Sequence, residues 1–338
     1  MTGRHRSLPI VALAVLTIGS CVTRRAPVSI DSQLALAATA LREGRLDEAS
    51  ELIVAARRRD PWHIDAARWS ALMADLLWRD DDAIREQSAA IRLARKASET
   101  LARKASETSA RKASEQAIVT ELRGQLGDLL FQAGRWGESS SPLLAGALGE
   151  VASRRRAFAI IASALPFVRR FSGPLVTEQP LLSGQSPEFI CGTSGLLRPF
   201  AIDTGTSMTT VASSFAEELG VRSKQAAGVA VDGAGRSLPI EVGLLSTFRI
   251  GNVDIGAVPV LVVSDRALHM RDLHGGPEHV PRGVLGLDLI AAARLTLDPE
   301  RGSVVLELPQ GLPIVDSVQC VRVEGRCLVP VVIEGKRL

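Results

Sequence analysis

The sequence has few aromatic residues and no marked excess of either charge. Tyrosine is absent, aromatic residues make up 4% of the 338 residues, and 40 basic against 37 acidic residues leave a net charge of +3. The arginine triplets at 57–59 and 154–156 have no aromatic platform on which bases could stack, and such runs are typical of solvated helix faces. We therefore expect no nucleic-acid partner. Hydrophobic residues make up 46% of the chain, which is enough for packed cores.

The N-terminal apolar run is short. Arg4 and Arg6 precede an apolar stretch, Leu8–Ile18, and small residues then lead to Cys21. A run of roughly eleven residues is too short to cross a bilayer as a helix, whereas its basic and small flanks fit a cleaved signal. Residues 1–21 therefore predict an export signal.

The end of this segment, LTIGSC, resembles the lipobox of bacterial lipoproteins. That resemblance implies lipidation of Cys21 and a place in the cell envelope, on the periplasmic side of a membrane. The alternative is an ordinary secretory signal in which Cys21 has no special role. Either reading puts the mature chain where disulfides persist. Of the remaining Cys191, Cys320 and Cys327, the last two are close enough to pair, but spacing leaves the connectivity open.

Residues 31–165 are rich in Ala, Leu, Arg and Glu at helical spacing, without strand-like alternation, which predicts a helical domain. Two stretches within it resemble tetratricopeptide repeats through turn glycines, small packing residues and a terminal proline. The matching positions are Gly44, Leu46, Ala49, Ile53, Ala56 and Pro61, and, more loosely, Leu126, Gly127, Gly134, Trp136 and Leu143. Residues 65–94 fit a degenerate helix pair between them. The resemblance implies an array that recruits a protein partner or substrate.

An octapeptide repeat, LARKASET, LARKASET, SARKASEQ, interrupts this domain over residues 93–116. Its period fits neither a coiled-coil heptad nor the α-helical repeat, and its apolar positions are mostly alanine. We expect an exposed helix or a mobile insert, without a binding function of its own.

A change of pattern marks the second half of the chain. Prolines and glycines over residues 166–186 predict a linker. Over residues 187–308, short apolar or alternating runs such as PFAI, GVAV, VPVLVV and SVVLEL are separated by Gly, Asn and Asp, which predicts an all-β domain. The expected fold class is therefore multidomain, with α-helical repeats followed by an all-β domain.

The stretch FAIDTGTSMTTV places a triad, Asp203, Thr204 and Gly205, directly after an apolar strand. Three further parts follow in order: a helix-like SSFAEELGV, a glycine-bearing hairpin GVAVDGAGRSLPIEV, and GVLGLDLI. Together they resemble the retropepsin-like aspartic proteases, the bacterial relatives of retroviral proteases, over residues 187–308. The resemblance implies an acid-protease fold that hydrolyses peptide bonds.

The resemblance also implies a role for each residue of the motif. Asp203 would be the catalytic carboxylate, the Thr204 hydroxyl would grip the matching loop of another half, and Gly205 would leave room for the substrate. The loop would be supported by Thr206, Gly286 and Asp288. A flap would close over the substrate; its residues are Val231, Asp232, Gly233, Ala234 and Gly235.

The chemistry of this family needs two aspartates, and the sequence contains one Asp-Thr-Gly. The other acids near recognisable motifs, Asp232, Asp288 and Asp298, lack the triad. One solution is a symmetric homodimer in which each chain contributes Asp203.

A second solution lies at the C-terminus, residues 309–338. Here LVPVVIEGKRL resembles the opening strands of another such domain, with Gly335 matching Gly195. On this hypothesis the chain is truncated shortly before a second triad. The alternative is a plain C-terminal β-hairpin.

Other groups of residues give weaker evidence for a functional site. His269, His274 and His279 cluster around Gly-Gly-Pro, but their spacing matches no standard zinc motif, so we expect no metal. No phosphate-binding glycine loop occurs, and no nucleotide cofactor is implied. Cys191 has no histidine placed by sequence to activate it.

Two function classes compete. The first is an exported, lipid-anchored aspartic endopeptidase whose substrate is a peptide or protein. The second is a non-catalytic TPR-type binding or scaffold lipoprotein with an inactive protease-like domain. The intact Asp203, Thr204 and Gly205 favour the enzyme, because a relic is free to lose its carboxylate. The missing second aspartate and the scarcity of aromatic residues weigh against it.

Overall fold

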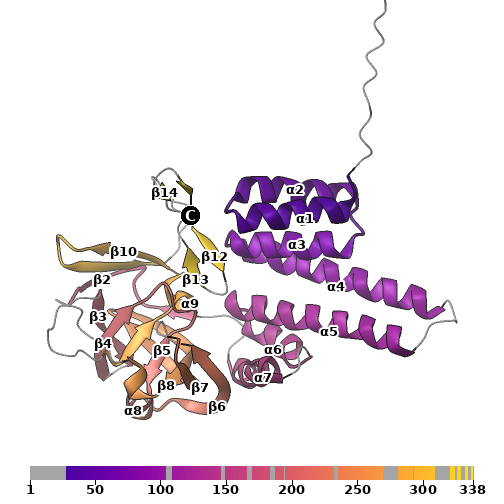
Figure 1. Ribbon diagram of the computed structural model, residues 1–338. Helices are drawn as coiled ribbons and strands as arrows, with labels where there is room; N and C mark the ends of the chain where they lie inside the picture. Colours follow the sequence, from indigo (N-terminus) through magenta and orange to yellow (C-terminus); the bar gives the residue numbers. More distant parts are fainter. Residues whose placement is uncertain are drawn as a thin grey trace, which may run out of the picture.

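A computed structural model of the chain shows a helical half followed by a β-rich half (Figure 1), which confirms the predicted fold class. The described residues are 28–103, 109–145, 149–165, 170–182, 187–193, 195–231, 235–268, 281–291, 293–308, 320–323, 326–328, 332–333 and 336–337. None of the described helices is long and apolar enough to cross a membrane. The predicted signal and Cys21 lie outside the described residues.

The helical half is a stack of antiparallel helices. Its helices are α1 (Ile30–Arg42), α2 (Leu46–Arg59), α3 (Ile64–Leu76), α4 (Asp80–Arg103), α5 (Ser109–Gln132), α6 (Trp136–Ala145) and α7 (Gly149–Ser163). α1 is capped by Ser29, whose hydroxyl accepts the Ser32 N–H at 3.1 Å. The second has Asp47 and Glu48 in its first turn and arginines in its last, which complements the helix dipole.

The pairs α1–α2, α3–α4 and α5–α6 are joined by the same tight turn. Gly44, Trp78 and Gly134 occupy the equivalent position, with φ of 72°, 59° and 71°, and the next N–H in each turn returns to a carbonyl in the preceding helix. At Gly127 a Cβ would lie 2.6 Å from the backbone nitrogen of Leu143, so glycine lets α5 and α6 approach closely. The helix pairs agree with the repeat interpretation, and their tetratricopeptide character stays a prediction.

The octapeptide repeat lengthens two of these helices. α4 continues to Arg103 and α5 begins at Ser109, so the described part of the repeat is helical. Its polar side chains, such as Arg95 and Lys96, are exposed. Figure 1 shows the joined ends of α4 and α5 projecting away from the β-rich half.

The β-rich half is built around one sheet. Its strands are β1 (Arg170–Ser172), β2 (Val176–Pro180), β3 (Glu188–Thr193), β4 (Leu196–Ile202), β5 (Thr210–Ala212), β6 (Arg222–Val231), β7 (Ser237–Ile250), β8 (Val253–Val263), β9 (Gly283–Leu285), β10 (Arg294–Asp298), β11 (Ser303–Glu307), β12 (Val321–Val323), β13 (Arg326–Leu328), β14 (Val332–Ile333) and β15 (Lys336–Arg337). The short helices are α8 (Ser213–Glu218), η1 (Asp265–Leu268) and α9 (Leu287–Ile290).

The main sheet runs in the order β1-β8-β5-β9-β4-β3-β7-β6, and an additional pairing of β7 with β8 closes it on itself. A second sheet has the order β10-β11-β2. Residues 166–186, predicted as a linker, instead supply β1, which pairs with β8, and β2, which pairs with β11. Both are short edge strands, where proline is tolerated because one side of the strand needs no partner.

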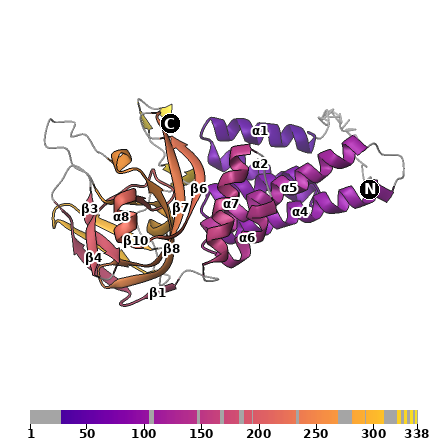
Figure 2. The same cartoon turned by 90° about the horizontal axis from the view of Figure 1, so that it is seen from below.

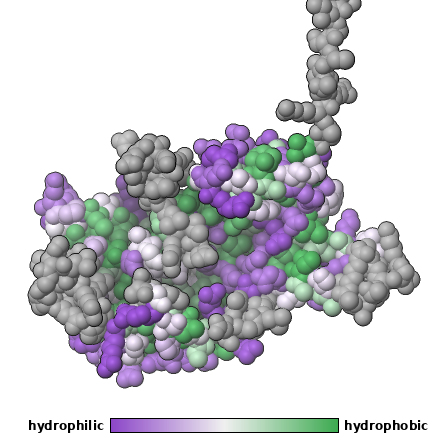
Figure 3. All heavy atoms as spheres, viewed as in Figure 1, coloured by the Kyte–Doolittle hydropathy of each residue, from purple (hydrophilic) through white to green (hydrophobic). Residues whose placement is uncertain are grey.

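One hydrophobic core joins the two halves. Phe131, Trp136 and Ile161 from the last helices belong to the same buried cluster as Phe200 and Phe248 of the closed sheet. α7 lies against β6, as Figure 2 shows. On the face seen in Figure 3, hydrophilic and hydrophobic residues are interspersed over the coloured part of the helical half. The helical array is therefore held against the β-rich half by shared apolar burial.

Candidate active site

The loop between β4 and β5 carries the Asp-Thr-Gly triad, and the strand between them sets its path. β9 pairs in parallel with β4 and antiparallel with β5, so residues 203–209 must pass across the end of β9. The Asp203 N–H donates to the carbonyl oxygen of Leu285 at 3.1 Å, and the Leu287 N–H donates to that of Thr206 at 2.9 Å. Backbone hydrogen bonds therefore fasten the loop to the segment that follows β9.

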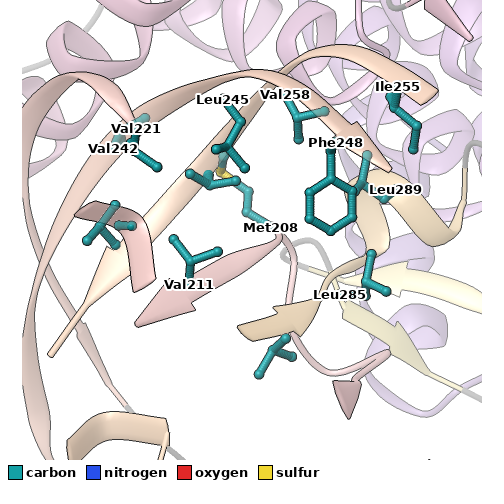
Figure 4. Close-up of a cluster of buried hydrophobic side chains, with 14 of the residues drawn as sticks. Met208, Val211, Val221, Val242, Leu245, Phe248, Ile255, Val258, Leu285 and Leu289 are labelled. Carbon is teal, nitrogen blue, oxygen red and sulfur yellow. The ribbon is translucent and has the colours of Figure 1, made fainter. Parts of the chain in front are cut away.

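Gly286 lies where these two backbones meet. A Cβ at this position would collide with the carbonyl group of Met208, and would stand 2.7 Å from the Thr209 nitrogen, so only glycine permits the contact. On the other side, the Met208 side chain is buried in the core with Leu245 and Phe248 (Figure 4). The loop is thus held by close backbone packing and by a buried anchor.

Asp288 supports the loop from behind. Its Oδ1 accepts the Thr209 N–H at 2.8 Å and the Thr209 hydroxyl at 2.9 Å. The same hydroxyl oxygen accepts the Gly286 N–H at 3.3 Å. Gly286 and Asp288, predicted as supporting residues, are therefore brought to the triad loop. Thr209 completes this network and was not singled out from the sequence, although its hydroxyl stands in the same TSMTT stretch.

The Asp203 carboxylate is exposed and oriented by its own loop. Its Oδ1 accepts the Gly205 N–H at 2.7 Å, and its Oδ2 accepts the Thr206 hydroxyl at 2.7 Å. Thr204 and Gly205 are also exposed. Hydrogen bonds to an ionised acceptor are short and strong, so they hold the carboxylate in one orientation. With one such donor on each oxygen, the carboxylate keeps lone pairs for a water or a substrate hydrogen bond.

The predicted flap is only partly described. β6 and β7 form an antiparallel hairpin whose last paired residues are Val231 and Ser237. Gly235 has φ of 78°, a left-handed conformation that favours glycine. The tip residues 232–234 lie outside the described residues, so the flap role of this hairpin stays a prediction.

The thiols of the described residues differ in environment. Cys191 is fully buried in β3, and burial raises the pKa of its thiol well above its ordinary value, so it is a poor nucleophile. Cys320, directly before β12, and Cys327, on β13, are free thiols. Burial, together with the hydrogen bond and the charge repulsion between the two sulfurs, raises the pKa of Cys327 to about 11. Disulfide pairing stays open.

No cluster suited to a metal ion occurs among the described residues. No three His, Cys, Asp or Glu side chains in these ranges lie together as a set of metal ligands. The histidines 269, 274 and 279 lie outside them.

The segment that carries the triad loop is also the one that is similar to known proteins. Residues 191–289 match the family model of the aspartyl proteases. The matched span begins in β3, includes the triad loop and the β6–β7 hairpin, and ends in α9. This match confirms the resemblance predicted for the β-rich half, which we call the protease-like domain.

Among solved structures the chain is similar to the crystal structure of a retropepsin-like aspartic protease from Rickettsia conorii. The two share 17% sequence identity, the match covers 41% of this chain and 96% of that chain, and the TM-score is 0.29. No curated protein matches the chain.

The protease-like domain also receives a contact from outside the matched span. The Cys327 N–H on β13 donates to the carbonyl oxygen of Thr204 at 3.3 Å. The sequence held no signal for this contact, because a backbone donor carries no residue type and the two residues are far apart in the chain.

Proposed function

We propose that the chain is an aspartic endopeptidase that hydrolyses peptide bonds with a water activated between two aspartates. Asp203 is one of them, and the other comes from a second copy of the chain or from a second domain. The observation that carries this proposal is the exposed Asp203 carboxylate, oriented by the Gly205 N–H and the Thr206 hydroxyl at 2.7 Å each. The family match at residues 191–289 supports the same chemistry.

The mechanism follows from two carboxylates at one site. Like charges about 3 Å apart do not both ionise, so the pair shares a proton. The ionised carboxylate takes a proton from water, whose oxygen attacks the peptide carbonyl carbon, while the protonated carboxyl donates to the carbonyl oxygen. The tetrahedral intermediate then collapses, the peptide nitrogen leaves with a proton, and a new carboxyl and a new amine result. The two pKa values belong to the pair.

Further parts of the proposal concern location and partners. We propose that residues 1–21 direct export, that Cys21 carries a lipid, and that the protein lies on the periplasmic side of a membrane. The helix pairs are proposed to recruit a protein partner or substrate. Labelling with a radioactive fatty acid, beside Cys21→Ser, tests the anchor: label on the wild type alone is expected, and equal label on both would contradict it.

The proposed function is tested by incubating the purified mature chain, and separately its Asp203→Asn variant, with a denatured protein mixture. Cleavage is expected from about pH 4 to pH 7 for the wild type, and the variant is expected to lose at least about a hundredfold in rate because the amide cannot act as a base. Mass spectrometry of the products measures both. Asp298→Asn, the same change outside the triad loop, is the matched control and should cleave like the wild type. Cleavage by Asp203→Asn at the wild-type rate would favour a contaminant and the rival binding-protein function.

A further inference from the structure

The β12–β13 hairpin contacts both the helical array and the triad loop. Figure 1 shows it between α3 and the main sheet, beside α9. Through β13 it reaches the loop, because the Cys327 N–H donates to the Thr204 carbonyl oxygen at 3.3 Å. Through β12 it reaches the array, because the Arg322 side chain enters the turn between α3 and α4. Arg322 and Cys327 are register partners across the hairpin.

Arg322 is buried among two carboxylates and an aromatic ring. Its side chain is 7% exposed, and its Nη2 donates to Asp75 Oδ1 at 2.5 Å and also to Asp80 Oδ1. Its Cζ lies 4.8 Å from the centroid of the Trp78 ring. A guanidinium suits this arrangement, because one of its nitrogens donates to both carboxylates while its flat face stacks on an aromatic ring. Removing such a buried charge leaves the carboxylates without their counter-charge.

Trp78 adds an independent observation. It occupies the position that Gly44 and Gly134 fill in the equivalent turns, with φ of 59°. The left-handed region disfavours a bulky residue, whereas glycine adopts it without strain. The array thus places a strained tryptophan in the turn that receives Arg322, and strain of this kind is retained where the surrounding structure fixes it.

We propose that Arg322 is a positioning residue, which anchors the β12–β13 hairpin to the α3–α4 turn so that the hairpin holds Thr204 and the loop bearing Asp203. The helical array is then part of the support of the active site as well as a surface for partners. The inference rests on the proposed function only in taking this loop as catalytic, since the contacts themselves do not depend on the activity.

Hydrogen exchange with mass spectrometry tests this in the full chain, for wild type, Arg322→Gln, Arg322→Lys and Trp78→Gly. Arg322→Gln is expected to speed exchange over 320–328 and over 203–209 by about tenfold or more, as loss of a buried ion pair opens the hairpin. Trp78→Gly relieves the strained turn yet removes the stacking ring, so it should also speed exchange in both segments. Arg322→Lys keeps the charge without the flat face that stacks on Trp78, and it should give an intermediate effect. Arg301→Gln, at an exposed arginine, is the matched control and should change neither segment.

Two results would overturn the proposal. One is unchanged exchange over 203–209 in both Arg322→Gln and Trp78→Gly. The other is faster exchange spread evenly over α1, α2 and the closed sheet, because Arg322 would then serve overall stability alone. Peptide cleavage by the same samples separates this from the proposed function. If the variants alter the exchange but no sample cleaves peptides, the positioning role stands and the peptidase function is contradicted. If the samples cleave peptides but the variants leave the exchange unaltered, the peptidase function stands and the positioning role is contradicted.

Discussion

Thr209 ties together the two segments that form the candidate site. It is fully buried, its hydroxyl donates to Asp288 Oδ1 at 2.9 Å, and its oxygen accepts the Gly286 N–H at 3.3 Å. A hydroxyl can donate and accept at once, whereas a methyl group can do neither. One small polar side chain therefore adds to the backbone contacts that hold the loop over the end of β9.

Thr209→Val should lower the free energy of unfolding by about 1–3 kcal/mol, because a buried N–H and a carboxylate oxygen each lose a partner. Thr209→Ser keeps the hydroxyl and should lose clearly less. Urea unfolding of the three proteins measures the difference. A valine variant as stable as the wild type would mean that the backbone contacts alone hold the loop.

At the residue scale, the sequence identified the site residues that lie next to one another in the chain. Asp203, Thr204 and Gly205 stand together in the chain, so their motif can be recognised without a structure. Thr209 acts through Asp288, from which it is separated by 79 positions. A contact between residues so far apart in the chain cannot be predicted from a local sequence pattern.

Among the elements, the short helix α8 has its cap supplied from elsewhere in the chain. Its own N-cap residue, Ala212, has no side chain that can accept a hydrogen bond. Instead Asp265, at the start of η1, accepts the Ser214 N–H and the Ser213 hydroxyl, each at 3.0 Å. A carboxylate at this end of a helix satisfies exposed N–H groups and favours the dipole.

The stability of the Asp265 cap should depend on pH. Hydrogen bonds from the side chain and backbone of Ser214 lower the pKa of Asp265 below its ordinary value of 3.8. Its contribution is therefore present above pH 3.8 and is lost as the pH falls through the folded pKa. Asp265→Asn should lower the free energy of unfolding by about 0.3–1 kcal/mol near pH 7, because the amide keeps an acceptor oxygen but loses the charge that the helix dipole favours. Its curve should converge with that of the wild type as the pH falls below the folded pKa of Asp265.

Urea unfolding at a series of pH values measures this convergence. Glu217→Gln, at an exposed carboxylate of α8 itself, is the control and should differ little from the wild type at any pH. A difference for Asp265→Asn that does not shrink as the pH falls below 3.8 would contradict the cap interpretation.

The existence and type of the main elements followed from the sequence, because helical spacing gives way to short alternating runs after residue 186. The boundary itself was placed too late. β1 and β2 are short strands among prolines and glycines, and they are defined by pairing with β8 and β11, far along the chain. The turn at Trp78 was equally hidden, since tryptophan is not a residue that predicts a left-handed turn.

At the scale of the whole molecule, the proposed mechanism requires a second aspartate. The sequence contains one Asp-Thr-Gly, and the Asp203 loop is exposed on the protease-like domain. If two chains each supply Asp203, the site forms only in a dimer, and the specific activity should fall on dilution. If a second domain beyond residue 338 supplies the partner, a chain that carries this domain should have an activity independent of concentration.

Mixing experiments distinguish these sources directly. When wild-type chain exchanges subunits with a tenfold excess of Asp203→Asn, almost every wild-type chain pairs with a variant chain, and its activity should fall about tenfold by random pairing. The same excess of Asp298→Asn is the control and should not lower the activity contributed by the wild type. Activity that survives the Asp203→Asn excess, with exchange verified by native mass spectrometry of differently labelled chains, would place both aspartates within one chain. The dimer would then have to be abandoned as the source of the pair, while Asp203 would keep its proposed role.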